Sequence, residues 1–266
     1  MSFFDTLNSA ILQKDSLLCI GLDPVFEKIP SRFQSSKTPM LDFCRYIIDE
    51  THEYAVAFKP NSAFFEAEGA NGIAQLKSIC EYIHATYPNT LIFLDAKRAD
   101  IGSTNEAYSK FAFHYLQADA ITLHPYLGQE GIQPFLDQKE KGCIILCHTS
   151  NPGAGEIQEL LVEGTPLFER VAHNISTHWN TNQNCMLVVG ATYPEQLKRV
   201  RGLVGDLPIL VPGIGAQGGN LEATLKVGLT DDKKGLIITV SRSVIFADDP
   251  KEEARKIHSE INNFRK

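Results

Sequence analysis

Three charged residues at short spacing stand out as groups able to do chemistry. Asp95, Lys97 and Asp100 follow directly after the apolar stretch 91–94. Residues i and i+2 of an extended strand point to the same face, so Asp95 and Lys97 are predicted to lie side by side. A carboxylate beside an ammonium suits a site that places charge against a substrate and then delivers a proton. The alternative interpretation is a surface salt bridge before a helix. Such a bridge contributes little to the stability of the fold.

Asp100 is predicted to point away from this pair. It lies beyond the end of the strand, where Gly102, Ser103 and Thr104 resemble the opening of a helix. An acid in that position does not share the strand face that carries Asp95.

Eight short apolar runs punctuate the chain, and most are continuously apolar, as expected of parallel strands covered on both faces. They are Leu17–Leu22, Tyr54–Phe58, Thr90–Leu94, Ala120–Leu123, Cys143–Cys147, Cys185–Val189, Ile209–Val211 and Leu236–Val240. Segments with helical spacing lie between them, at Leu41–Glu53, Gly72–Tyr87, Asn105–Leu116, Thr165–Trp179, Pro194–Val200, Asn220–Val227 and Pro250–Phe264. The alternation predicts an α/β fold, a single (β/α)8 barrel over residues 1–266, with a doubly wound sheet as the alternative.

Polar residues able to bind or react follow nearly every run on its carboxyl side. These endings are the segments 21–23, 59–61, 95–97, 124–126, 148–153, 212–219 and 241–243. In a barrel, all the carboxyl ends of the strands gather on one face, where active sites are built. The sequence therefore predicts one site assembled from many strand ends.

The last two endings favour binding of a phosphate. Glycines at 213, 215, 218 and 219 allow backbone N–H groups to approach a ligand closely. Arg242, after the eighth run, has the planar donor geometry that grips an oxyanion. The same glycines match a G-x-G-x-x-G string, but it occurs late in the chain and no acidic residue completes a following βαβ unit, which disfavours a dinucleotide site. A plain glycine turn is the other alternative.

Composition limits the classes of protein and partner. The 266 residues are 43% hydrophobic and carry a net charge of −7, which argues against a broad nucleic-acid surface. No apolar run approaches the length of a membrane span, and the start lacks the basic and apolar regions expected of a signal peptide. Six cysteines without a C-x-x-C pair are expected to be small core residues of a reduced, cytoplasmic protein, at positions 19, 44, 80, 143, 147 and 185.

The ordered motifs resemble those of the orotidine 5′-phosphate decarboxylase family, most closely its longer bacterial branch. They are G-L-D-P, F-K-P-N, D-A-K-R-A-D-I-G-S-T, T-S-N-P-G, V-P-G-I-G-A-Q-G-G and S-R-S, and the similarity runs from Gly21 to about Phe246. The resemblance implies a (β/α)8 barrel that works as a homodimer, needs no metal or organic cofactor, and converts orotidine 5′-phosphate to uridine 5′-phosphate and CO2.

The resemblance also implies catalytic roles for four residues. Lys97 would protonate C6 of the pyrimidine as CO2 leaves, and Asp95 would lie beside the substrate carboxylate. Lys59 would complete the charge array and contact the ribose. Asp100, together with Thr104, would reach into the partner subunit's site. Asp95 would also keep Lys97 protonated, since a nearby anion favours the charged form.

The remaining implied roles concern substrate binding. Asp23 would bind ribose hydroxyls and Ser150 the pyrimidine amide, while Gln217 would bridge base and phosphate. The phosphate would be held by Arg242 and by the backbone of the loop, at Pro212, Gly213 and Gly215.

Some residues near the motifs receive no role. His124 stands where this branch is expected to have Asn, and His148 is expected to be a packed histidine. Asn61 has only weak support for a place near the site. Ser241 stands where other branches have glycine, which leaves a backbone phosphate contact there open.

Two rival functions remain. A sugar-phosphate decarboxylase or hexulose-phosphate synthase of the same broad group would share D-x-K-x-x-D but use a divalent metal, which calls for carboxylate ligands. Lys59 stands where that rival is expected to have a metal-binding acid. The second rival is a non-catalytic barrel that merely binds a nucleotide, and the complete set of charged residues argues against it.

Overall fold

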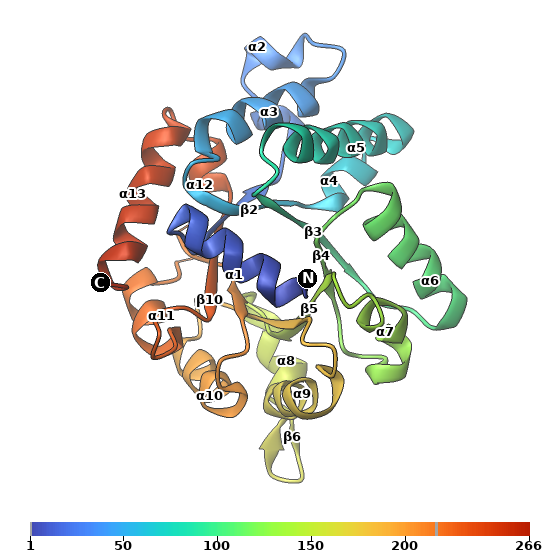
Figure 1. Ribbon diagram of the computed structural model, residues 1–266, viewed down its shortest axis with the longest axis vertical. Coiled ribbons are helices and arrows are strands. Elements are labelled where there is room, and N and C mark those ends of the chain that lie inside the picture. The colour runs from blue at the N-terminus through green and yellow to red at the C-terminus, as the bar shows by residue number, and fades with distance from the viewer. Residues whose placement is uncertain (1, 216–217) are drawn as a thin grey trace.

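Eight parallel strands close into a barrel in the computed structural model, which describes residues 2–215 and 218–266 (Figure 1). The strands are β1 (Leu18–Leu22), β2 (Ala55–Pro60), β3 (Leu91–Arg98), β4 (Ala120–Leu123), β5 (Gly142–His148), β8 (Cys185–Val189), β9 (Ile209–Val211) and β10 (Leu236–Val240). Their hydrogen-bonded order is β1-β10-β9-β8-β5-β4-β3-β2, with the ends paired. All eight predicted runs are barrel strands, so the barrel prediction is confirmed and the doubly wound alternative is wrong.

The strands are apolar on both faces because the fold covers both faces. Side chains of the strands fill the barrel interior on one side and meet a ring of helices on the other. Six of the eight strands are buried along their whole length. Of the two exceptions, β3 becomes partly exposed toward its carboxyl end, and β5 is half-buried only at Leu146.

The outer ring holds all seven predicted helices and one helix, Gly128–Leu136, that was not predicted (Figure 1). It consists of α3 (Pro39–Thr51), α5 (Gly69–Thr86), α6 (Gly102–Lys110), α7 (Gly128–Leu136), α9 (Leu167–Asn174), α10 (Pro194–Val204), α11 (Leu221–Gly228) and α13 (Pro250–Asn263). Helices α6 and α9 each continue into a π-helical turn, η2 (Phe111–Tyr115) and η4 (Ile175–Trp179). The start predicted for α9 at Thr165 is wrong, because β7 (Thr165–Pro166) pairs with β6 (Leu161–Val162) in a small hairpin.

One helix closes the amino-terminal end of the barrel. Helix α1 (Phe3–Lys14) crosses that end in Figure 1 and buries Phe3, Leu7, Ala10 and Ile11. Its capping box pairs Ser2 with Asp5. A side chain at Gly142, the first residue of β5, would lie 2.4 Å from the Phe3 ring, so glycine is required there. The opposite, carboxyl end of the barrel is therefore the end open to a ligand.

Short elements follow several strands and were not predicted. They are η1 (Phe26–Lys28), α2 (Ser31–Gln34), α4 (Ser62–Glu66), η3 (Pro152–Ala154), α8 (Gly155–Gln158) and α12 (Arg242–Ile245). Each is three to five residues long, too short for a periodic apolar pattern to reveal it.

The six cysteines are buried and free, as predicted. Burial in apolar surroundings raises the pKa of Cys19 and of Cys80 to about 12. A thiol that stays protonated is a poor nucleophile and a poor metal ligand, so these side chains behave as small apolar groups.

Candidate active site

The carboxyl ends of the barrel strands surround a cavity of 510 Å³. Eight of the predicted site residues line it: Asp23, Lys59, Asp95, Lys97, Ser150, Pro212, Gly213 and Arg242. Polar side chains to which the sequence analysis gave no role line it too: Asn61, Thr122, Thr149, Asn151, Gln158, Thr239, Ser241 and Ser243. The barrel thus brings together residues that are more than 200 positions apart in the chain.

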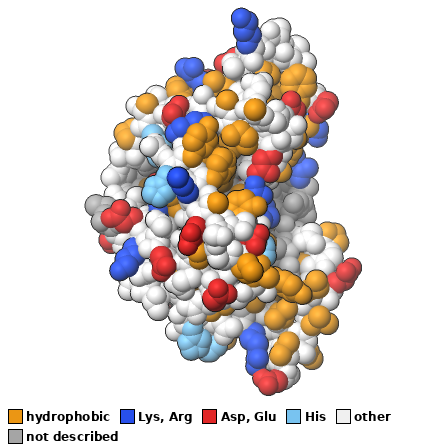
Figure 2. All heavy atoms as spheres, turned by 90° about the vertical axis from the view of Figure 1, so that its right-hand side faces the viewer, with side chains coloured by type: hydrophobic (Ala, Val, Ile, Leu, Met, Phe, Trp, Pro, Cys, Tyr) orange, Lys and Arg blue, Asp and Glu red, His pale blue; other side chains and the backbone are white. Residues whose placement is uncertain are grey.

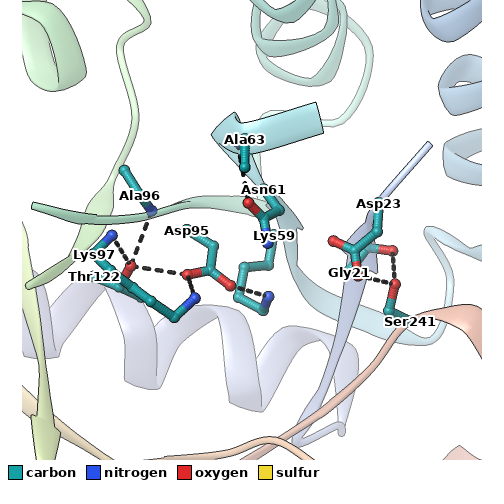
Figure 3. Close-up of polar contacts among 10 residues, drawn as sticks. All are labelled: Gly21, Asp23, Lys59, Asn61, Ala63, Asp95, Ala96, Lys97, Thr122 and Ser241. Carbon is teal, nitrogen blue, oxygen red and sulfur yellow. Dashed lines mark hydrogen bonds and ion pairs between the residues drawn. The ribbon is translucent and has the colours of Figure 1, made fainter. Parts of the chain in front are cut away.

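Asp95 forms the centre of the charged array (Figure 3). Its Oδ2 lies 2.8 Å from Lys59 Nζ, and its Oδ1 lies 2.6 Å from Lys97 Nζ. The side chains of Lys59 and Asp95 are 9% and 10% exposed, whereas that of Lys97 is 50% exposed. One ammonium is therefore buried with the carboxylate, and the other is open to the cavity.

The prediction that Asp95 and Lys97 are neighbours is confirmed, but the extended backbone assumed for it is wrong. Lys97 has φ +46°, in the left-handed region. The pairing of β3 with β4 shifts register between Leu94 and Arg98. A bulge therefore brings the two side chains together, since such bulges bend a strand and redirect a side chain.

The charges around Asp95 control its protonation. Burial alone raises the pKa of the Asp95 carboxyl, but Lys59 and Lys97 more than offset it, and the pKa lies well below the ordinary range. For Lys59 the directions are reversed. Burial lowers its pKa, but the attraction of Asp95 and Asp23 more than offsets this effect, so the pKa of Lys59 lies above the ordinary value. Both groups are charged at neutral pH.

Asp23 lies across the cavity mouth at the end of β1 and is held by Ser241. Ser241 Oγ donates to Asp23 Oδ2 at 2.6 Å (Figure 3). Asp23 Oδ1 is buried and has no protein partner among the described residues, so it is the oxygen left for a ligand hydroxyl. A Cβ on Gly21 would lie 2.8 Å from Ser241 Cβ, which shows why glycine at 21 accompanies serine at 241.

The segment after β5 forms another wall. The Gln158 side chain accepts from the Thr149 backbone N–H at 2.8 Å and donates to Thr149 Oγ1 at 2.8 Å. Ser150, next to Thr149, packs directly on Gly190, where a Cβ would lie 2.6 Å from Ser150 Cα. This wall therefore rests on α8 on one side and on the end of β8 on the other.

His148 is a packed residue, as predicted. It is fully buried, and its ring contacts Phe168 and Tyr193 edge-on. Its Nε2 lies 3.1 Å from Glu159 Oε1. Burial lowers the pKa of His148, which favours the neutral ring. It ties the end of β5 to the segment after α8 and is not among the residues that line the cavity.

The glycines that follow β9 have backbone conformations that suit glycine. Gly213 and Gly215 have φ values of +102° and +75°. Gly219 N donates to the Gly213 carbonyl at 3.0 Å. Arg242, the first residue of α12, is exposed and lines the cavity with Gly213. Gly215 does not line the cavity, and Gln217 lies outside the described residues.

Asp100 and Thr104 do not line the cavity of their own chain. Asp100 Oδ1 accepts from the Ile101 N–H at 2.7 Å, and the Asn105 side chain bonds to both backbone groups of Asp100. Thr104 is exposed on α6. The prediction that Asp100 points away from Asp95 is confirmed within the chain, and a role in a second subunit stays a prediction.

Two features are absent from residues 2–215 and 218–266. No group of three or more His, Cys, Asp or Glu side chains is arranged to hold a metal ion. No helix in this part of the chain is long and apolar enough to cross a membrane.

Thr122 and Ser241 are functional candidates that sequence reasoning missed or left open. Thr122 is buried on β4 and bonds to β3, 26 positions earlier. The only local signal for it is a polar residue inside the apolar run Ala120–Leu123. For Ser241 the signal was its place next to Arg242, which indicated the loop but not the bond to Asp23.

Comparison with known proteins identifies the relatives. Residues 16–257 match the model of the "Orotidine 5'-phosphate decarboxylase / HUMPS family". The chain is 48% identical over 262 residues to orotidine 5′-phosphate decarboxylase of Cellvibrio japonicus, covering 97% of this chain and 95% of the relative. Leishmania donovani OMP decarboxylase superposes with a TM-score of 0.89 at 43% identity, covering 100% and 99% of the two chains. Leishmania donovani UMP synthase gives a TM-score of 0.92 at 45% identity, and this chain spans 57% of that longer chain.

Proposed function

Since this chain belongs to the orotidine 5′-phosphate decarboxylase family, we propose that it decarboxylates orotidine 5′-phosphate with Lys97 as the proton donor to C6. The enzyme is a carboxy-lyase of pyrimidine biosynthesis, like the relatives it matches. The observation that carries the proposed mechanism is the Asp95 carboxylate held between Lys59 and Lys97 on the cavity wall.

The chemistry explains the need for a cation at this place. Loss of CO2 from C6 leaves an electron pair in an in-plane orbital that the ring π-system cannot delocalise. An ammonium placed where that charge develops stabilises it and then supplies the proton. Lys97 is the half-exposed ammonium of the array, so it is the one that a substrate in the cavity can reach. After the transfer its neutral amine regains a proton from water.

Asp95 and Lys59 hold Lys97 ready for this step. The Asp95 carboxylate favours the protonated form of Lys97 and fixes the direction of its side chain. Lys59 balances the remaining charge of Asp95, which keeps a buried carboxylate ionised. Beside the substrate carboxylate, Asp95 also favours departure of CO2.

The rest of the cavity is assigned to the remote parts of the substrate. Asp23, with one oxygen directed by Ser241 and the other unpartnered, binds ribose hydroxyls. The glycine-rich loop at 212–215 and Arg242 bind the phosphate. Ser150 binds the pyrimidine amide, and Gln217 remains assigned to base and phosphate on sequence grounds. Binding energy from these remote groups orients C6 against Lys97.

We also propose a homodimer in which Asp100 and Thr104 complete the partner subunit's site. Asp100 follows the end of β3 and Thr104 lies in the first turn of α6, and both are outside their own cavity. Large apolar side chains are exposed after β3 and after the neighbouring strand β4: Ile101 is 59% exposed and Tyr126 is 82% exposed. Figure 2, which views the molecule from the side of α6 and α7, shows hydrophobic side chains among charged ones on this face. Covering such side chains is a common basis of subunit contacts.

The charged array around Asp95 favours chemistry without a metal. A divalent cation at Asp95 would face two ammonium nitrogens within 2.8 Å of the same carboxylate, and like charges repel strongly at that range. This disfavours the metal-dependent sugar-phosphate rival. The six buried, unpaired cysteines suit the cytoplasm as the location.

Ultraviolet absorbance of orotidine 5′-phosphate mixed with the purified protein tests the function. Conversion to uridine 5′-phosphate with release of CO2 is expected in excess EDTA. Conversion only after Mg²⁺ is added would favour the metal-dependent rival. No conversion under either condition would favour the binding-only barrel.

The role of Lys97 is tested by Lys97→Ala. Turnover is expected to fall below detection, because the proton donor and the charge that stabilises the carbanion are both removed. Binding of uridine 5′-phosphate, measured by calorimetry, is expected to persist because the phosphate and ribose contacts remain. A kcat near that of the wild type would contradict the assignment.

A further inference from the structure

The backbone at the proposed proton donor is unusual for its position. Lys97 lies in β3 with φ +46°, a conformation that side chains other than glycine adopt at an energetic cost. The register with β4 shifts at the same place. The backbone N–H groups there therefore do not form the regular hydrogen bonds of paired strands. Some other contact must hold this bulge.

The hydroxyl of Thr122 on β4 is that contact (Figure 3). Thr122 Oγ1 accepts from the Ala96 N–H at 3.0 Å and from the Lys97 N–H at 2.8 Å. It donates its own proton to Asp95 Oδ1 at 3.0 Å. These three bonds use both lone pairs and the single proton of a hydroxyl. Thr122 is 2% exposed, so water does not compete freely for these bonds.

One hydroxyl therefore joins the backbone of the proton donor to the carboxylate that orients it. Asp95 Oδ1 is also the oxygen that receives Lys97 Nζ at 2.6 Å. The bond to the Lys97 N–H sets the backbone of the residue, and the bond to Asp95 sets the anchor of its side chain. Thr122 Oγ1 thus fixes both ends of the Lys97 side chain, the backbone end directly and the ammonium end through Asp95.

We propose that Thr122 is a positioning residue, whose hydroxyl holds the left-handed bulge at Lys97 and so aims its ammonium at the reacting carbon. The inference rests on the proposed role of Lys97. The Thr122 hydroxyl acts through Lys97 and Asp95 and not on the substrate directly. Its three bonds to protein atoms leave it no donor or acceptor for a hydrogen bond to the substrate.

Paired substitutions separate the hydroxyl from the shape of the side chain. Thr122→Val keeps the branched shape and loses the hydroxyl, whereas Thr122→Ser keeps the hydroxyl and loses a methyl group. Thr122→Val is expected to lower kcat by about 100-fold, the order of loss that a displacement of about 1 Å causes in an active site. Thr122→Ser is expected to retain most of the wild-type kcat. The KM for orotidine 5′-phosphate and the Kd for uridine 5′-phosphate are expected to change little in either variant.

Thr224→Val is the matched control. The Thr224 hydroxyl is fully buried on α11 and has no hydrogen-bond partner in the described part of the chain. Its removal is expected to leave kcat unchanged. The concentration of folded sites in each variant is measured by titration with uridine 5′-phosphate, so that kcat refers to folded enzyme.

Three results would overturn the inference: wild-type kcat in Thr122→Val, an equal loss in Thr122→Ser, or a loss confined to KM. If Thr122→Val does not fold, Thr122→Ala replaces it and the same loss of kcat is required. Lys97→Ala, measured in parallel, separates the two proposals. Turnover by Lys97→Ala would refute the proton-donor role, whereas an inactive Lys97→Ala beside a fully active Thr122→Val would refute only the role of Thr122.

Discussion

The two carboxylates of the site, Asp95 and Asp23, differ in how far the protein itself occupies their oxygens. Asp95 contacts Lys59, Lys97 and Thr122, so both of its carboxylate oxygens are engaged by protein. A buried carboxylate with such partners stays ionised, and its partners keep one geometry. In Asp23, by contrast, the protein engages only one carboxylate oxygen: Oδ2 is bonded to Ser241, and Oδ1 has no partner among the described residues. The first arrangement suits an electrostatic anchor, and the second suits a ligand contact.

The pKa of Asp95 leads to a prediction about acid stability. A carboxyl whose pKa is lowered by folding stabilises the protein above its unfolded pKa, about 3.9, and loses that contribution as the pH falls through the folded value. The difference in unfolding free energy between wild type and Asp95→Asn is therefore expected to be constant from neutral pH down to about pH 4 and to shrink below it. Urea denaturation across that range measures it. A difference that already declined between pH 7 and pH 5 would contradict the assigned ionisation.

The same reasoning applies to Lys59 with the opposite sign. Its pKa is raised by folding, so its contribution is complete below the unfolded value and is lost only as the pH rises through the folded value. The array is thus expected to keep its charges throughout the neutral range.

At the scale of elements, the site depends on irregularities where strands end. The bulge in β3 redirects Lys97, and a second register shift, between Leu146 and His148, occurs where β5 pairs with β8. Beyond that shift, the segment carrying Ser150 crosses the end of β8 at Gly190. Regular strands form the barrel, and the irregular ends determine where the functional side chains point.

Gly190→Ala tests this contact between elements. The new Cβ would meet the backbone of Ser150 at 2.6 Å, so the wall that carries Ser150 must move. We expect kcat/KM to fall by about tenfold or more, since substrate contacts tolerate little displacement. Steady-state kinetics on orotidine 5′-phosphate measure the effect.

Gly202→Ala is the matched control for this substitution. Gly202 is exposed on α10, and a Cβ there meets no atom within 4 Å. Alanine in a helix is favoured over glycine by about 0.5–1 kcal/mol, so this variant is expected to be slightly more stable and fully active. Equal activity of the two alanine variants would show that the Ser150 wall does not depend on Gly190.

At the scale of the whole molecule, the barrel separates stability from chemistry. Helix α1 closes the amino-terminal end with buried apolar side chains, and the carboxyl end carries the cavity. The hairpin β6–β7 projects from the ring at the bottom of Figure 1. Asp100 and Thr104 lie outside the cavity of their own chain, and in the proposed dimer they complete the site of the partner subunit.

Mixing two inactive variants tests that arrangement. Lys97→Ala and Asp100→Ala are each expected to be inactive alone. Random pairing in a homodimer makes about half of the dimers mixed, each with one complete site, so about a quarter of wild-type activity is expected after the subunits exchange. Verified mixed dimers without activity would show that Asp100 serves its own subunit.

Much of this molecule was predictable because its signals are local in the chain. Eight apolar runs predicted eight strands, since a strand covered on both faces must be apolar along its length. Polar residues directly after the runs predicted the site, since a barrel collects the carboxyl ends of its strands on one face. Neither inference required knowledge of which side chains touch.

The contacts that orient the site depend on residues far apart in the chain and became visible only in three dimensions. The left-handed backbone at Lys97, the Thr122 hydroxyl that holds it, and the bond from Ser241 to Asp23 all arise from neighbouring strands. Periodicity reports which face of an element is buried, but it carries no information on which hydroxyl meets which backbone group. Strand register and bulges decide those meetings, and they follow from the packing of the closed barrel as a whole.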